Sequence, residues 1–147
     1  LDKGVMHGGT YNGNVQSMAA ALAALDVLEA GDGAVYRDLE RRGTKLMQGL
    51  TALAAKHKVP VKVQGAPAIF QVHFTDGKGP KNYRDAQACD RDKALAFHRG
   101  LQEDGIRINQ VAKFFLSTAH DDAIIDETLV AADKVMGTLS AISASKG

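Results

Sequence analysis

A glycine-rich segment at residues 8–13, followed at once by an alanine-rich segment, constrains the fold of this chain more than any other feature. Its three glycines and Asn12 supply positive-φ positions and little packing surface, so the segment is predicted to be a loop. Asn14 is a good helix N-cap, and apolar residues then recur every three or four positions until Gly31. The sequence therefore predicts a loop that runs into a helix, and the nearly uncharged first half of that helix predicts that it is buried.

A second helix and a hairpin are predicted next. After a Gly-Asp-Gly break the apolar residues mark one face of an amphipathic helix. Two strand-like segments follow, residues 59–63 and 68–74, and the turn residues 64–67 between them indicate an antiparallel hairpin. In the second strand apolar side chains alternate with Gln71 and His73, so one face of the strand is predicted to meet a core.

The last third of the chain repeats the helix and strand pattern. A helix ends at Gly105, short strands at residues 106–108 and 114–116 flank a loop, and a final helix starts near Asp121. The full order is helix, helix, strand, strand, helix, strand, strand, helix. This order predicts an α+β fold, a two-layer domain in which helices cover a small, mainly antiparallel sheet.

Composition excludes several classes of protein. The 147 residues carry 18 Lys and Arg against 17 Asp and Glu, which leaves no basic patch for nucleic acid or an anionic membrane. The longest uncharged run, residues 4–25, contains too many polar residues to span a bilayer. A single cysteine, Cys89, fits a reducing compartment, so we expect a cytoplasmic protein. Because the chain opens at Leu1 rather than at methionine, we also expect that it is cut from a longer protein.

The glycine-rich loop is the strongest candidate for a binding site. Backbone N–H groups, the Thr10 hydroxyl and the positive end of a helix dipole together can bind an anion, for which phosphate is the usual occupant. The spacing matches neither of the common nucleotide-binding motifs, so a plain loop before a capped helix remains the alternative.

Other reactive side chains are interpreted conservatively. The five histidines have no metal-ligand spacing, so no metal site is predicted, and hydrogen-bonding roles are expected for His7 and His120. Cys89 has no indicated base and is interpreted as a small hydrophobic residue. Arg107 lies on a short strand between apolar residues and could bind a carboxylate, although an ion pair is the alternative.

Two segments resemble a known family. Residues 7–14 (His-Gly-Gly-Thr-Tyr-Asn-Gly-Asn) followed by residues 18–21 (Met-Ala-Ala-Ala) resemble the loop and alanine-rich helix of class III pyridoxal-phosphate aminotransferases. Residues 117–120 (Ser-Thr-Ala-His) followed by residues 126–129 resemble the last strand and final helix of that family. The likeness is closest to the branch of glutamate-1-semialdehyde aminomutases and β-amino acid transaminases. It extends over essentially the whole chain and fits the family's C-terminal portion.

The resemblance implies a fold, a cofactor and a partner. It implies the small domain of a fold-type I pyridoxal-phosphate enzyme, with residues 1–31 joining it to a large domain and residues 32–147 forming the small domain. Gly9 and Thr10 match the positions that contact the cofactor phosphate across a homodimer interface. The lysine that binds the cofactor would lie upstream in the large domain, because Lys3 is too close to the loop to match it. We therefore expect the 147-residue chain to be inactive by itself.

The loop before the last strand indicates the substrate only weakly. The loop before the last strand reads Gln-Val-Ala-Lys at residues 110–113, where the aminomutases carry a carboxylate and some β-transaminases an arginine. We expect a general transaminase acting on an amino donor and an oxo acid or aldehyde, with Arg107 or Lys113 holding a substrate carboxylate. An aminomutase is the second candidate, and a stand-alone, non-catalytic α+β interaction domain is an alternative of another class.

Overall fold

The computed structural model describes residue 4 and residues 8–144, with the side chains of residues 141–144 left aside. The elements occur in the order α1 (Val15–Lys56), β1 (Val61–Ala66), β2 (Ile69–Phe74), α2 (Tyr83–Gln87), α3 (Arg91–Glu103), β3 (Lys113–Phe115) and α4 (Asp122–Ala144). The chain divides into two compact units, Leu1–Arg37 and Asp38–Gly147. The predicted domain boundary between residues 31 and 32 remains a prediction.

The first unit contains the loop and the first part of α1. As predicted, Asn14 caps the helix, because its Oδ1 accepts a hydrogen bond of 2.9 Å from the Ser17 N–H. The helical backbone is interrupted from Ala30 to Gly33, and Gly31 has the left-handed φ of 60° that ends many helices. The predicted break between two helices is therefore confirmed, and it interrupts α1.

The apolar face of the first part of α1 differs from the prediction. The side chains of Val15, Met18, Leu22 and Leu25 are all exposed, at 80%, 48%, 63% and 50% respectively. The prediction of a buried helix is therefore wrong for this chain. The physical reason is that the described part of Leu1–Arg37 contains no second helix or strand on which this face could pack.

The second unit is built around a three-stranded antiparallel sheet in the order β1-β2-β3. The central strand β2 turns Phe70, Val72 and Phe74 to one face, where each is 1% exposed. Phe114 of β3 lies directly opposite Phe70, and the two rings stack with centroids 4.9 Å apart. The alternation predicted for this strand is confirmed, with Gln71 and His73 on the other face of the sheet.

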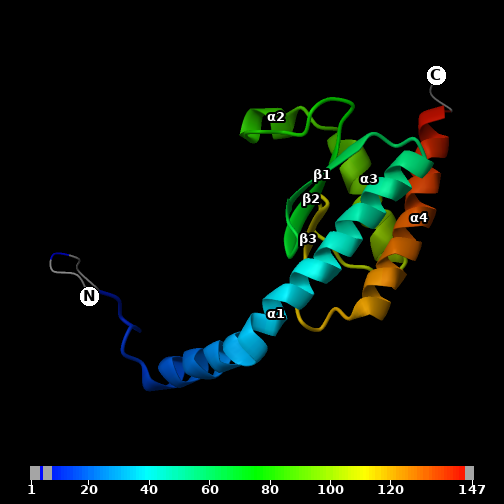
Figure 1. Cartoon of the computed structure of the whole chain (residues 1–147). Helices are drawn as coiled ribbons and strands as arrows, with labels where there is room; N and C mark the ends of the chain where they lie inside the picture. The colour runs from blue at the N-terminus through cyan, green and yellow to red at the C-terminus, as the bar shows by residue number, and fades with distance from the viewer. Residues whose placement is uncertain (1–3, 5–7, 145–147) are drawn as a thin grey trace. The chain divides into compact units, whose positions relative to one another are not determined.

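Three helices form the layer that covers this apolar face. Figure 1 shows α3, α4 and the part of α1 after Asp38 gathered beside the sheet. The buried core joins all of these elements, and its largest side chains are Phe70, Phe74, Phe97, Leu46, Leu50, Leu101, Ile125 and Met136. The structure is thus the α+β, two-layer arrangement that the sequence predicts.

The hairpin turn and one strand lie elsewhere than predicted. β1 continues through the predicted turn residues to Ala66, so that only Pro67 and Ala68 connect the strands. Gly65 permits this with a φ of 139°, a conformation that favours glycine. Residues 106–108 form no strand, because the Ile106 N–H bonds to the Leu101 carbonyl at 2.8 Å and so closes the end of α3.

The short helix α2 was not predicted from the sequence. Its N-cap is Asn82, whose Oδ1 accepts a hydrogen bond of 3.1 Å from the Asp85 N–H. The Asn at this position, with an acidic residue three places later, is a helix-start signal that could have identified it.

Two helix glycines allow close packing in the second unit. Gly43 is buried on α1, and a Cβ at this position would overlap the Pro67 carbonyl oxygen and lie 2.8 Å from Pro67 Cα. A Cβ on Gly49 would lie 2.5 Å from Leu129 Cδ2 of α4. The helix α1 therefore approaches both the hairpin turn and α4 more closely than alanine would permit.

We predict that Gly43→Ala lowers the free energy of unfolding by about 1–3 kcal/mol, because backbone at the hairpin turn must move to admit the methyl group. Urea denaturation would measure the change. Gly137→Ala is the matched control: its Cβ would meet only the His57 ring, at 3.3 Å, and it should cost much less. Equal effects of the two substitutions would contradict close packing at Gly43.

An ion pair joins α1 to the start of α4. The two terminal guanidinium nitrogens of Arg41, Nη1 and Nη2, donate hydrogen bonds to the Asp122 carboxylate, at 2.8 and 2.9 Å. These bonds lower the pKa of Asp122 below its usual 3.8, and the pKa of Arg41 is raised for the same reason. A depressed carboxyl pKa adds stability above the ordinary pKa, and this stability is lost as the pH falls through the lowered value.

We therefore predict that Asp122→Asn destabilises the protein at pH 7 and that its difference from wild type narrows as the pH falls below about 4. Denaturation midpoints recorded between pH 7 and pH 2 would measure this. Asp76→Asn removes a loop carboxylate that makes no ion pair among the described residues, and it should follow the wild-type pH dependence. A difference that widened in acid would disprove this interpretation.

Candidate functional site

The loop before α1 has the features that an anion site needs. Residues 8–13 are exposed, and the Thr10 hydroxyl has no hydrogen-bond partner among the described residues. The Asn12 N–H closes the turn on the Gly9 carbonyl at 3.1 Å. A Cβ at Gly9 would lie 2.7 Å from Asn12 Oδ1, the tip of an exposed side chain, so the Asn12 amide lies directly over Gly9. The predicted residues Gly9 and Thr10 thus occupy an open turn just ahead of a capped helix.

The other two predicted site residues lie together in the second unit. Arg107 and Lys113 line one hollow of about 590 Å³, between the end of α3 and the start of β3. Neither side chain makes an ion pair among the described residues. The sequence did not identify the other residues that line the hollow, which are His98, Gln102, Ile108, Asn109, Gln110 and Phe115.

Asn109 shapes the turn that carries Lys113. Its Oδ1 accepts hydrogen bonds from the N–H groups of Val111 and Lys113, at 3.1 and 3.0 Å. Its carbonyl accepts the Ala112 N–H at 3.0 Å, and Ala112 has a φ of 55°. An asparagine that bonds to the backbone two residues later is a turn signal, which could have identified this residue from the sequence.

The polar face of the sheet lies next to this turn. Gln71 is opposite Lys113 in the register and donates a hydrogen bond of 2.8 Å to the Val111 carbonyl. The pKa of His73 is lowered, first by burial of the imidazole and then by the positive charge of Lys113. The Lys113 ammonium therefore acts electrostatically on this face of the sheet as well as on the hollow.

The remaining reactive side chains have structural roles or lie outside the described residues. His120 Nδ1 accepts a hydrogen bond of 2.8 Å from the Ser117 N–H, as its predicted hydrogen-bonding role requires. His7 and Lys3 fall outside the described residues. Burial raises the pKa of the Cys89 thiol, and the Asp85 charge raises it further, which opposes thiolate chemistry.

The described residues contain neither a metal-binding cluster nor a membrane-spanning helix. They include no group of three or more acidic, His or Cys side chains placed to hold a metal ion. No described helix combines the length and the apolar character needed to cross a membrane.

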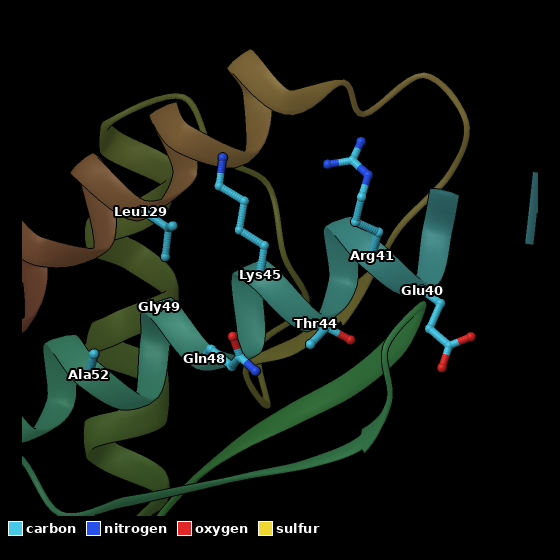
Figure 2. A pocket seen from close by; sticks show the side chains of 8 residues that line it. All are labelled: Glu40, Arg41, Thr44, Lys45, Gln48, Gly49, Ala52 and Leu129. Carbon is cyan, nitrogen blue, oxygen red and sulfur yellow. The ribbon is translucent and has the colours of Figure 1, made fainter. Parts of the chain in front are cut away.

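A second hollow, of about 600 Å³, lies on the surface of α1 beside α4. Figure 2 shows Arg41 and Lys45 on α1 and Leu129 on α4 at its edges. Both cations already have partners. Arg41 bonds to Asp122, and Lys45 Nζ lies 2.6 Å from Asp126 Oδ1. Because its charges are compensated within the protein, this hollow is a weaker candidate for an anion site than the one at Arg107.

Comparison with known protein families gives a match over most of the chain. A family model described as aminotransferase class-III matches residues 2–139. A glutamate-1-semialdehyde 2,1-aminomutase from Methanothrix thermoacetophila is 38% identical over 130 residues, which are 87% of this chain and 29% of that protein. The corresponding enzyme from Methanothermobacter thermautotrophicus is 37% identical over 137 residues, 92% of this chain and 32% of its own length.

Two similar solved structures are also aminotransferases. An omega-transaminase from Sphaerobacter thermophilus has a TM-score of 0.76 and 26% identity, over 90% of this chain and 30% of that one. A beta-phenylalanine aminotransferase from Variovorax paradoxus has a TM-score of 0.79 and 29% identity, over 93% of this chain and 31% of that one. The chain thus spans about three-tenths of the length of the proteins it matches.

The pKa of His73 offers a test of the electrostatics at this turn. We predict that Lys113→Met raises it, because a neighbouring positive charge disfavours the protonated imidazole and its removal favours it. The His73 pKa should rise only part of the way to the ordinary histidine value, since burial of the ring still lowers it. An NMR titration of the histidine Cε1–H signals would measure this. Arg107→Met is the control and should leave the His73 titration unchanged, and an unaltered titration in Lys113→Met would refute the coupling.

Proposed function

Because this chain belongs to the class-III aminotransferase family, we propose that it is the C-terminal part of a pyridoxal-phosphate-dependent aminotransferase. The whole enzyme would transfer an amino group between an amino acid or amine donor and an oxo acid or aldehyde. The family match over residues 2–139, with the Gly9-Thr10 turn inside it, is the observation that carries this proposal. We place the enzyme in the cytoplasm.

The turn fits the phosphate group of the cofactor. Gly9 has no side chain to shield the backbone of the exposed turn, and the exposed Thr10 hydroxyl is available as a hydrogen-bond donor. The helix that starts at Val15 adds the partial positive charge of its N-terminus. A dianionic phosphate would therefore meet a hydroxyl, backbone N–H groups and a favourable helix dipole at one turn.

When bound, pyridoxal phosphate supplies the electron sink that makes removal of the substrate proton possible. The contribution of this chain would be binding. Thr10, with the backbone at Gly9, would hold the cofactor phosphate of the neighbouring subunit in a homodimer. The lysine that attaches the cofactor would lie outside these 147 residues.

The hollow in the second unit is proposed to hold a substrate carboxylate. Arg107 presents a planar guanidinium, which suits two-point contact with a carboxylate, and Lys113 adds a point charge. Both cations lack partners among the described residues, which supports a role toward an external anion.

Aminomutase activity is the second candidate function. The relatives that are 37–38% identical to this chain are named as glutamate-1-semialdehyde 2,1-aminomutases. Incubating the whole enzyme with glutamate-1-semialdehyde in the absence of an amino acceptor would distinguish aminomutase activity from transaminase activity. Formation of a 5-amino product would support the aminomutase, whereas a requirement for an oxo acid would support the transaminase.

We predict that Thr10→Val in the whole protein weakens pyridoxal phosphate binding by about tenfold, which corresponds to the loss of one hydrogen bond to a charged group. Equilibrium dialysis would measure the dissociation constant. Thr51→Val is the matched control, because the Thr51 hydroxyl bonds at 2.8 Å to the Met47 carbonyl of its own helix. Equal binding by wild type and Thr10→Val would remove Thr10 from the phosphate site.

The 147-residue chain gives a complementary test. Pyridoxal phosphate added to this chain should produce no lysine-dependent visible absorption band, since the attachment lysine is proposed to lie elsewhere. A band that disappeared in Lys3→Ala would overturn this part of the proposal. Failure of the whole protein to bind pyridoxal phosphate would favour the stand-alone interaction domain.

A further inference from the structure

The break inside α1 has an unusual backbone. Ala30 has an extended ψ of 140°, and Gly31, Asp32 and Gly33 follow with φ values of 60°, 56° and 72°, all in the left-handed region. One left-handed residue is a common helix end, but such residues normally occur singly, because an L side chain disfavours this conformation. Asp32 has such a side chain, so backbone preference alone does not account for the left-handed turn at residues 31–33.

The Arg37 side chain bonds to this left-handed turn. Its Nη2 donates a hydrogen bond of 2.7 Å to the Gly31 carbonyl, and its Nη1 donates one to the Asp32 carbonyl. Long side chains on a helix point back toward its N-terminus, which brings the guanidinium to the turn that precedes its own helix segment. One planar group thus binds two successive carbonyls. Nη1 also lies 3.9 Å from Asp32 Oδ2, but this carboxylate is fully exposed, so the ion pair adds little.

An uninterrupted right-handed helix is the alternative backbone for the break. This part of the chain contains no proline that would forbid it. In that helix the Gly31 and Asp32 carbonyls would point along the axis to the N–H groups four residues later rather than to Arg37. The left-handed turn strains Asp32, whereas the continuous helix has two glycines in its interior, so each state carries a cost. Because Arg37 bonds to the two carbonyls only in the left-handed turn, its bonds favour that state.

We propose that Arg37 is a latch that holds α1 in two segments. With its guanidinium on the two carbonyls the helix is broken at residues 30–33, and on release α1 continues as one right-handed helix. The Arg37 side chain is 62% exposed, so these bonds can open without disturbing a core. The latch is a conformational switch at the C-terminal end of the first unit. It goes beyond the proposed function and does not depend on the cofactor.

NMR on the 147-residue chain distinguishes the two states. In the wild type, Asp32 should show the strong contact between its own N–H and Hα that a positive φ produces. Contacts between the Hα of one residue and the N–H three residues later should be absent across residues 30–33. In Arg37→Met these helical contacts should appear or strengthen, because the bonds that favour the left-handed turn are lost.

Gly31→Ala makes the measurement more sensitive. Alanine is strained at a φ of 60°, its Cβ would lie 3.2 Å from Ala34 Cβ, and alanine favours a helix, so this variant should populate the continuous state. Adding Arg37→Met should raise the ratio of continuous to broken helix at least about fivefold, the effect of about one net hydrogen bond. If Arg37→Met left this ratio unchanged in both the wild-type and the Gly31→Ala backgrounds, the latch would be disproved.

Arg99→Met is the matched control. Arg99 is a helix arginine on α3 that makes no ion pair among the described residues. Its replacement removes the same charge from the chain and should leave the signals of residues 30–33 as they are in the wild type. An equal effect of Arg99→Met and Arg37→Met would show that net charge, not the carbonyl bonds, sets the balance, and would refute the latch.

Asp32→Asn separates the carbonyl bonds from the ion pair. Asparagine tolerates the left-handed conformation and keeps the backbone carbonyl, but it has no charge to pair with Arg37. The broken state should therefore persist in this variant. A shift to the continuous helix as large as that of Arg37→Met would assign the effect to the ion pair and contradict the proposal. None of these measurements needs the cofactor or a second subunit, so their failure would leave the aminotransferase proposal standing.

Discussion

Burial of one face of a narrow sheet is the constraint on which the second unit depends. With only three strands, the sheet has a single central strand, and β2 supplies Phe70, Val72 and Phe74 to the core. Each such side chain contributes about 1.5–3 kcal/mol when it is removed from water. Three helices must cover this face, and the glycines of α1 let that helix come close enough to do so.

The same alternation determines what lies on the opposite face. Once the three apolar residues of β2 point to the core, Gln71 and His73 must point away from it, because side chains alternate along a strand. Gln71 then meets the turn before β3 and bonds to Val111. The Val72 N–H bonds to the Ala112 carbonyl at 3.0 Å, so the core strand also holds the turn that carries Lys113. Core packing and the position of the hollow are therefore coupled through β2.

The first unit is stabilised differently. Its helix has a capped start and a left-handed end, both of which are local features. Its apolar side chains are exposed, so the described residues of this unit contribute little tertiary packing to the helix. A chain that spans about three-tenths of its relatives' length is expected to expose surfaces that the rest of such a protein would cover.

The sequence by itself determined the features that depend on neighbouring residues. The Asn14 cap, the break at Gly31, the alternation in β2 and the start of α4 near Asp121 all follow from local backbone and side-chain chemistry. The family resemblance, which rests on two short segments, also came from the sequence and is confirmed by the match over residues 2–139.

Only the tertiary structure decided the features that depend on distant partners. Residues 106–108 have strand-forming side chains but form no strand, and the Ile106 N–H bonds to the Leu101 carbonyl at the end of α3. β1 extends to Ala66 because its pairing with β2 supplies hydrogen bonds that turn propensity does not account for. The hollow joins His98 on α3 to Lys113 on β3, and no spacing in the sequence indicates that pair. Long-range contacts set these positions, because packing and strand pairing outweigh local preference where the two differ.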